Sequence, residues 1–233
     1  MLYPQSNTYR QVKDLSGFWD FQFDPQNQGV QKGWFKGLPQ GRPIAVPASW
    51  NDQLEEGKNN LGPAWYQTRF NLPQGFKDQK VFLRFDSVNY LAEVWLNGVK
   101  LGSHEGGHLP FGFEITSEVS GSNLLVVRVD GQLAPDRVPP GNMTFDPKDA
   151  FANSFYPSAS FDFFPYCGIQ RPVLLVTTPE SSIEDITITP SVQGSKGLVH
   201  VNVKTTPGIQ FALRFTLTGF GKKIVKDISN SNS

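Results

Sequence analysis

Short runs of apolar residues, many alternating with polar ones, are separated by glycine and proline along most of the chain. The 18 prolines and 22 glycines are spread throughout, and no long window shows the 3.6-residue repeat of an amphipathic helix. Such punctuation is typical of many strands joined by turns. The pattern predicts an all-β fold whose first strands are residues 17–23, 44–46, 65–70, 81–85, 92–96, 99–101, 113–115, 124–129 and 173–176.

The clearest local signal is a β-hairpin at Asn97-Gly98. These two residues accept the positive φ angles of a type I′ turn, and they lie between the apolar runs 92–96 and 99–101. Strands spread over so long a stretch suit a sandwich better than a small barrel. We therefore expect a jelly-roll β-sandwich over residues 1–179.

A second, smaller unit is expected over residues 180–233. Apolar residues there alternate strictly with polar ones in residues 183–188, 199–203 and 211–217. Only about four strands are present where an immunoglobulin-like sandwich has about seven. The pattern predicts an incomplete immunoglobulin-like β-sandwich, and no (β/α)8 barrel is expected in this sequence.

Between residues 130 and 164 the strand pattern lapses. The stretch contains several prolines and then a cluster of aromatic residues between 151 and 164. Loops of this length inside a compact domain are usually functional.

Charge and cysteine content narrow the function classes. The 21 basic and 21 acidic residues are scattered singly, so no electrostatic patch points to nucleic acid or to an anionic membrane. No signal peptide and no run of about 18 apolar residues is evident, which favours a cytoplasmic location. The single cysteine, Cys167, excludes an internal disulfide, and we expect a buried free thiol.

Two interpretations compete for His104 to Phe111, whose sequence is HEGGHLPF. On a helix, His104 and His108 would share one face, with Glu105 as the general base of a zinc hydrolase. Two glycines and a following proline disfavour that helix, and the only other histidine is His200. A glycine-hinged loop leaving the hairpin is favoured, with no metal and no cofactor.

The tryptophans leave two roles open. Their indole rings are suited to stacking on sugars, yet large aromatic residues are more often buried in the core. The core is favoured for at least four of the five, and Trp95 is able to face either way. The five residues are Trp19, Trp34, Trp50, Trp65 and Trp95.

Several motifs together give the chain a family resemblance. They are Leu15–Phe21, Val46–Asp52, Trp65-Tyr66, Val94–Gly98 and His104–Phe111. In order and spacing they resemble the sugar-binding domain of the glycoside hydrolase family that contains β-galactosidase and β-glucuronidase. The β-glucuronidase branch in particular is resembled by His104–Phe111, Val138–Gly141 and Asp162–Leu175. The resemblance spans essentially residues 1–225.

The resemblance implies that the family's chain continues through the immunoglobulin-like domain into a (β/α)8 barrel. That barrel carries the two glutamates of a retaining mechanism. This sequence stops before the barrel, and the Asn-Glu dipeptide that usually surrounds the acid/base does not occur in it. We therefore expect no catalytic residue and no turnover by this chain alone. The implied partners of the full-length enzyme are a glucuronide and further copies of itself in a homo-oligomer.

One substrate-binding residue is implied within this sequence, at Asp162. In the family this aspartate reaches the active-site cleft and accepts hydrogen bonds from sugar hydroxyls, as an ionised carboxylate is able to do. From the residues alone, the alternative is that Asp162 caps a turn. The sequence departs from the usual Asp-Phe-Phe-Asn-Tyr-Ala-Gly pattern at Pro165 and Cys167. Because Pro165 restricts Phe164 and removes a backbone donor, it bears on the direction of the Asp162 side chain.

Three functions are therefore open. The favoured one is the non-catalytic N-terminal part of a β-glucuronidase-like retaining hydrolase, which removes terminal β-D-glucuronic acid from glucuronides. The second is an independent carbohydrate-binding module, supported by shared jelly-roll topology alone. The third is a structural or oligomerisation role, in which an exposed apolar patch mediates contacts.

The incomplete second unit generates a prediction for residues 211–217. We expect them to form an edge strand that is mobile or prone to aggregation, because an edge presents unpaired N–H and C=O groups. Hydrogen–deuterium exchange read by mass spectrometry checks this expectation. Uniform protection across residues 211–217 would contradict it.

Overall fold

The computed structural model describes residues 3–132, 166–208, 210–219 and 221–229. The chain divides into two compact units, Met1–Thr177 and Thr178–Ser233, and each is described by itself. Strands dominate the described residues, so the predicted all-β class is confirmed. The domain ranges 1–179 and 180–233 stay a prediction, with which this division is compatible.

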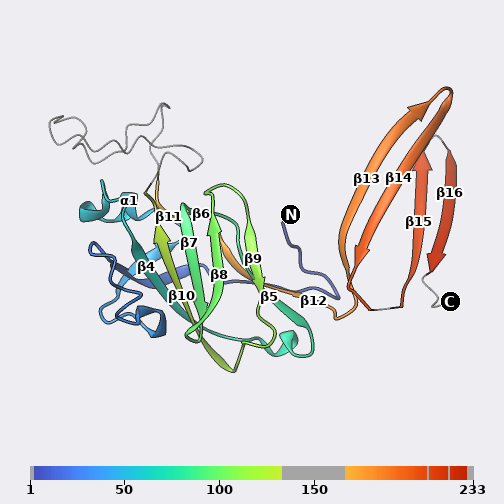
Figure 1. Cartoon of the computed structure of the whole chain (residues 1–233). Coiled ribbons are helices and arrows are strands. Elements are labelled where there is room, and N and C mark those ends of the chain that lie inside the picture. Colours follow the sequence, from blue (N-terminus) through green and yellow to red (C-terminus); the bar gives the residue numbers. More distant parts are fainter. Residues whose placement is uncertain (1–2, 133–165, 209, 220, 230–233) are drawn as a thin grey trace. The chain divides into compact units, whose positions relative to one another are not determined.

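The first unit contains two open sheets (Figure 1). The six-stranded sheet has the order β3 (Arg42–Val46), β2 (Gly17–Phe23), β4 (Ala64–Asn71), β10 (Ser122–Asp130), β7 (Leu91–Leu96) and β8 (Val99–Glu105). The four-stranded sheet has the order β1 (Val12–Asp14), β12 (Val173–Thr178), β5 (Lys80–Phe85) and β9 (Phe111–Glu114). A short separate ladder joins β11 (Gly168–Ile169) to β6 (Val88–Asn89).

The core lies between the two sheets, because alternate residues of each strand point to the same face. Phe21 and Val127 of the six-stranded sheet and Leu83 of the four-stranded sheet belong to one buried cluster. Aromatic rings fill its centre, where Phe21 meets Tyr66 edge to face with ring centroids 4.9 Å apart. The sandwich predicted for this part of the chain is confirmed.

A smaller apolar cluster covers the outer face of the six-stranded sheet. It contains Trp34, Trp65 and Trp95. Asp24 holds the covering loop, since its carboxylate accepts from Trp65 Nε1 at 3.0 Å and from the Gly29 N–H at 2.8 Å. All five tryptophans are buried, so the predicted core role is confirmed, with Trp95 in this outer layer.

The hairpin turn predicted at Asn97-Gly98 is present. The two residues have φ angles of 52° and 82°, which fit a type I′ turn between β7 and β8. Strand β8 continues to Glu105, so His104 lies on a strand and not in the predicted loop. The reason is that the ladder persists, with His104 opposite Ala92.

Helical structure is limited to short turns among the described residues. They are α1 (Trp50–Gln53) and the 3₁₀ turns Trp34–Lys36, Glu55–Gly57 and Gln74–Phe76. In this part of the chain no helix has the length and apolar character needed to cross a membrane.

The second unit consists of two antiparallel hairpins. One pairs β13 (Ile183–Gln193) with β14 (Lys196–Thr205), and the other pairs β15 (Ala212–Gly219) with β16 (Lys222–Ser229). Strand β16 is absent from the strands predicted above, because Lys222 and Lys226 interrupt its apolar positions. The predicted edge strand is thus paired on one side, by β16.

Each hairpin carries an apolar face that is largely open to solvent. On β13 the side chains of Ile186, Ile188 and Val192 share one face with Val199 of β14, and Val192 is 80% exposed. On the other hairpin Leu217 lies opposite Ile224. Unlike the first unit, these faces lack a fully buried cluster among the described residues.

Two phenylalanines on β2 allow a matched test of the core. Phe21 is fully buried and Phe18 is 81% exposed. We expect Phe21→Ala to lower the free energy of unfolding by about 3–5 kcal/mol, because a large cavity opens between the sheets. Phe18→Ala should change it by less than about 0.5 kcal/mol. Urea unfolding followed by tryptophan fluorescence measures both, and equal effects would count against the described packing.

Candidate functional site

The residue predicted to contact sugar, Asp162, lies outside the described residues. The description resumes at Tyr166, four positions further along. The nearest described backbone is therefore Tyr166 to Ile169. Its attachments to the sandwich define the candidate site.

Residues of the Val46–Asp52 motif hold the main chain of Cys167. The Cys167 N–H donates to Asn51 Oδ1 at 2.8 Å, and Ser49 Oγ donates to the Cys167 carbonyl at 2.9 Å. The Trp50 backbone N–H donates to the same carbonyl at 3.3 Å. Both polar backbone groups of this buried residue are thereby satisfied.

Helix α1 places these two side chains. Ser49 is its N-cap, and its Oγ accepts from the Asn51 N–H at 3.2 Å. The Asn51 side chain also donates through Nδ2 to the Gly57 carbonyl at 2.8 Å and to the Asn60 carbonyl at 3.0 Å. Its oxygen therefore faces a donor and its nitrogen faces acceptors, which fixes the orientation of the amide.

A second support comes from β6. Gly168 and Ile169 pair with Asn89 and Val88 of that strand. The Tyr166 carbonyl accepts from Asn89 Nδ2 and from Gln170 Nε2. The segment is thus bound to the sandwich at its backbone on successive residues.

The same region holds the loop between β8 and β9. Ser87 Oγ donates to the Gly107 carbonyl at 2.5 Å, and the Gly106 N–H donates to the Tyr90 carbonyl at 3.3 Å. A Cβ atom at Gly107 would collide with the Asn89 side chain. Residues 87–90 therefore contact both the loop at Gly106-Gly107 and the Tyr166–Ile169 segment, which lie far apart in the sequence.

The histidines of this loop have surroundings unlike those of a zinc site. The His104 ring stacks on Phe111 with centroids 4.2 Å apart and an angle of 13° between the rings. His108 is exposed, and no helix forms between them. His200 lies on β14 of the other unit. No group of three metal-ligating side chains occurs in the described part of the chain.

Cys167 is the buried free thiol that the sequence predicts. A Cβ atom at Gly131 would collide with its Sγ, so the surroundings are tightly filled. Burial raises the pKa of the Cys167 thiol, and the charge of Asp130 raises it further. Burial also raises the pKa of the neighbouring Tyr66 hydroxyl, with a further contribution from Cys167. Both groups are therefore neutral at physiological pH.

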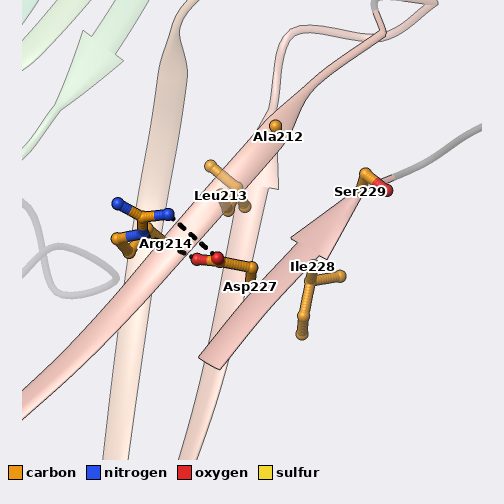
Figure 2. Close-up of a pocket in the computed structure, with 6 residues that line it drawn as sticks. All are labelled: Ala212, Leu213, Arg214, Asp227, Ile228 and Ser229. Carbon is orange, nitrogen blue, oxygen red and sulfur yellow. Dashed lines mark hydrogen bonds and ion pairs between the residues drawn. The ribbon is translucent and has the colours of Figure 1, made fainter. Parts of the chain in front are cut away.

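A shallow cavity of about 420 Å³ lies on the second hairpin of the other unit (Figure 2). Arg214 and Asp227 form a bidentate pair across it, with N–O distances of 2.8 and 3.0 Å. The hydrogen bond from Arg214 lowers the pKa of Asp227. Both charges are exposed and already paired, so this cavity gives no specific support for ligand binding.

The roles of Ser49 and Asn51 were missed from the sequence. In the sequence, the Val46–Asp52 motif serves as a family marker and indicates no role for either residue. A serine preceding a short helix is a capping signal. The partner of Asn51 lies 116 positions away, however, and no local pattern identifies it.

Comparison with known families matches residues 12–179 to the family described as "Glycosyl hydrolases family 2, sugar binding domain". The match includes Val46–Asp52, the loop after β8 and the Tyr166–Ile169 segment. The motifs that the fold brings together thus all lie within the matched range.

Similarity to curated proteins extends beyond residues 12–179. The chain is 37% identical to a β-glucuronidase of Rattus norvegicus, over 97% of the chain and 38% of that protein. It is also 37% identical to a β-glucuronidase of Paenibacillus borealis, over 88% of the chain and 35% of that protein. The chain therefore spans less than two-fifths of the length of these relatives.

Solved structures of β-glucuronidases are also similar to this chain over nearly its whole length. A β-glucuronidase of an uncultured Clostridium sp. has a TM-score of 0.82 and 33% identity, covering all of this chain and 41% of its own. A β-glucuronidase of Ruminococcus gnavus, solved with uronic isofagomine, has a TM-score of 0.81 and 31% identity. That comparison covers 99% of this chain and 40% of the neighbour.

The buried thiol predicts an alkaline dependence of stability. The folded-state pKa of Cys167 is raised, while the unfolded thiol loses its proton near its usual pKa of about 8.5. The stabilisation is therefore complete below that pKa and is lost as pH rises, by up to ~1.4 kcal/mol per pH unit. The free energy of unfolding, measured in urea between about pH 8 and 10, should fall less steeply with pH for Cys167→Ala than for the original chain. Parallel declines would refute the prediction.

Proposed function

Because the chain belongs to the sugar-binding-domain family of the glycosyl hydrolases family 2, we propose that it is the non-catalytic N-terminal part of a β-glucuronidase. In this proposal the whole enzyme removes terminal β-D-glucuronic acid from glucuronides by a retaining mechanism. The chain supplies a sugar-contacting segment and a scaffold, and a catalytic barrel supplies both glutamates.

The observation that carries the proposal is the extent of similarity to β-glucuronidases. It runs over nearly the whole chain, past the matched family range and into the second unit. The Ruminococcus gnavus relative was solved with a uronic acid analogue, which supports a uronic acid as the sugar.

The described contacts are consistent with a sugar-contacting role for Asp162. The backbone that follows it is attached to the sandwich at Tyr166, Cys167 and Ile169. A binding group is effective when its supporting backbone is fixed in advance. An ionised carboxylate at Asp162 would then accept hydrogen bonds from adjacent sugar hydroxyls.

A structural role is a second candidate, favoured by the open apolar faces of the second unit. Ile188 and Val192 are largely exposed on one face of β13, and Ile224 is largely exposed on β16 of the other hairpin. Contiguous exposed apolar residues mark contact surfaces. An independent sugar-binding module receives less support, because the five tryptophans that would serve as stacking platforms are buried.

A chimera tests the proposed function. Residues 1–233 joined to the part of the Clostridium β-glucuronidase that follows its aligned region should hydrolyse p-nitrophenyl β-D-glucuronide. The isolated chain should show no hydrolysis above buffer. In the chimera, Asp162→Asn should lower kcat/KM by about 10- to 100-fold, because a hydrogen bond to a charged group contributes about 1.5–3 kcal/mol.

Asp149→Asn is the matched control, since Asp149 lies in the same stretch of sequence. Its kcat/KM should stay within about threefold of the unmodified chimera if Asp162 is the carboxylate that contacts the sugar. A chimera that prefers galactosides to glucuronides would contradict the assigned substrate. Equal effects of the two substitutions would contradict the role of Asp162.

A further inference from the structure

The outer edge of strand β3 is occupied by a side chain from the same chain. Strand β3 (Arg42–Val46) is the last strand of the six-stranded sheet and pairs with β2 on one side. On the other side of such an edge strand, the backbone N–H and C=O groups are available for pairing with a strand of another molecule. Gln53, the last residue of α1, makes hydrogen bonds to this edge.

The Gln53 amide bonds to Ala45 in the way that a neighbouring strand would. Its Oε1 accepts from the Ala45 N–H at 2.8 Å, and its Nε2 donates to the Ala45 carbonyl at 3.1 Å. The Nε2 also donates to the Ser49 carbonyl at 3.1 Å, which ties the side chain to the start of α1. The oxygen and the two N–H donors of the amide are thereby all used. Both backbone groups of Ala45 on this edge are therefore occupied.

Two prolines extend the blocked stretch on either side of Ala45. The N–H groups of residues two positions apart on a strand point to the same side. Pro43 and Pro47 therefore stand at the positions that flank Ala45 along the outer edge. Because proline has no N–H, an incoming strand would find no free donor at residues 43, 45 and 47.

We propose that Gln53 acts with Pro43 and Pro47 to close the β3 edge to a strand of a second copy of this chain. The edges of two identical strands are able to pair in the antiparallel direction about a two-fold axis, so an open edge is self-complementary. Such a ladder needs backbone donors as well as acceptors on both strands. The closure concerns association between copies and does not depend on sugar contact.

Amide exchange of Ala45 in the intact chain tests the contact. Gln53→Ala should raise the exchange rate of the Ala45 N–H, followed by NMR, by about five- to tenfold, as the loss of one hydrogen bond predicts. Gln53→Met, which keeps the length of the side chain but has no amide, should raise the rate equally. Gln22→Ala is the matched control, because Gln22 Oε1 accepts from the Gln40 N–H at 3.2 Å. That substitution should leave the Ala45 rate within about twofold.

Self-association of the intact chain, measured by sedimentation velocity, tests the closure. The double variant Pro43→Thr/Gln53→Ala restores one donor and frees Ala45, so it should self-associate at least about tenfold more tightly than the original chain. Each single substitution should change self-association by less than about threefold, because part of the edge stays blocked. Association through the apolar faces of the second unit is common to all four proteins and cancels in the comparison.

Pro43 and Gln53 are both exposed, so the substituted chains should keep their fold, which tryptophan fluorescence checks. An unchanged Ala45 exchange rate in Gln53→Ala would overturn the inference, because the amide would then not cover this edge. The inference would also be overturned if the double variant associated no more tightly than the product of the two single effects predicts, since independent sites combine in that way.

Discussion

Burial of the inner faces of two sheets against each other is the constraint on which the first unit depends. Alternating side chains of the two sheets fill one cluster, with Phe21, Tyr66 and Leu83 fully buried in it. Burial of such side chains stabilises a fold by about 1.5–3 kcal/mol each. Chain segments that are attached to the ends of these strands are therefore held in fixed positions. The segment beginning at Tyr166 is one such attachment, through β6 and helix α1.

The hydrogen bonds to the Cys167 backbone also follow from burial between the sheets. When the backbone of Cys167 enters the buried region, its N–H and C=O lose water and need partners. Asn51 and Ser49 supply them, and the cap of α1 holds both side chains in place. The attachment of Cys167 thus arises from the ordinary requirement that buried backbone groups be hydrogen-bonded.

The sequence predicted the elements whose signals are local. Alternation located β2 and β5, a nearly continuous apolar run located β10, and Asn97-Gly98 located the hairpin turn, because each signal depends on neighbours along the chain. Contacts between distant segments carry no such signal, which is why the link between Asn51 and Cys167 was missed. Strand β16 was missed for a local reason, since Lys226 stands at a position where alternation calls for an apolar residue.

That lysine also bears on edge-to-edge pairing of the second unit with other chains. A two-stranded hairpin is marginally stable by itself, and exposed edges invite pairing with other chains. Pro190 removes a backbone donor from β13, and Lys226 places a charge beside Ile224 and Ile228 on the apolar side of β16. These features discourage pairing at the edges but leave the apolar faces open. Contacts of the second unit are therefore expected to form face to face, whereas a fully buried core stabilises the first unit.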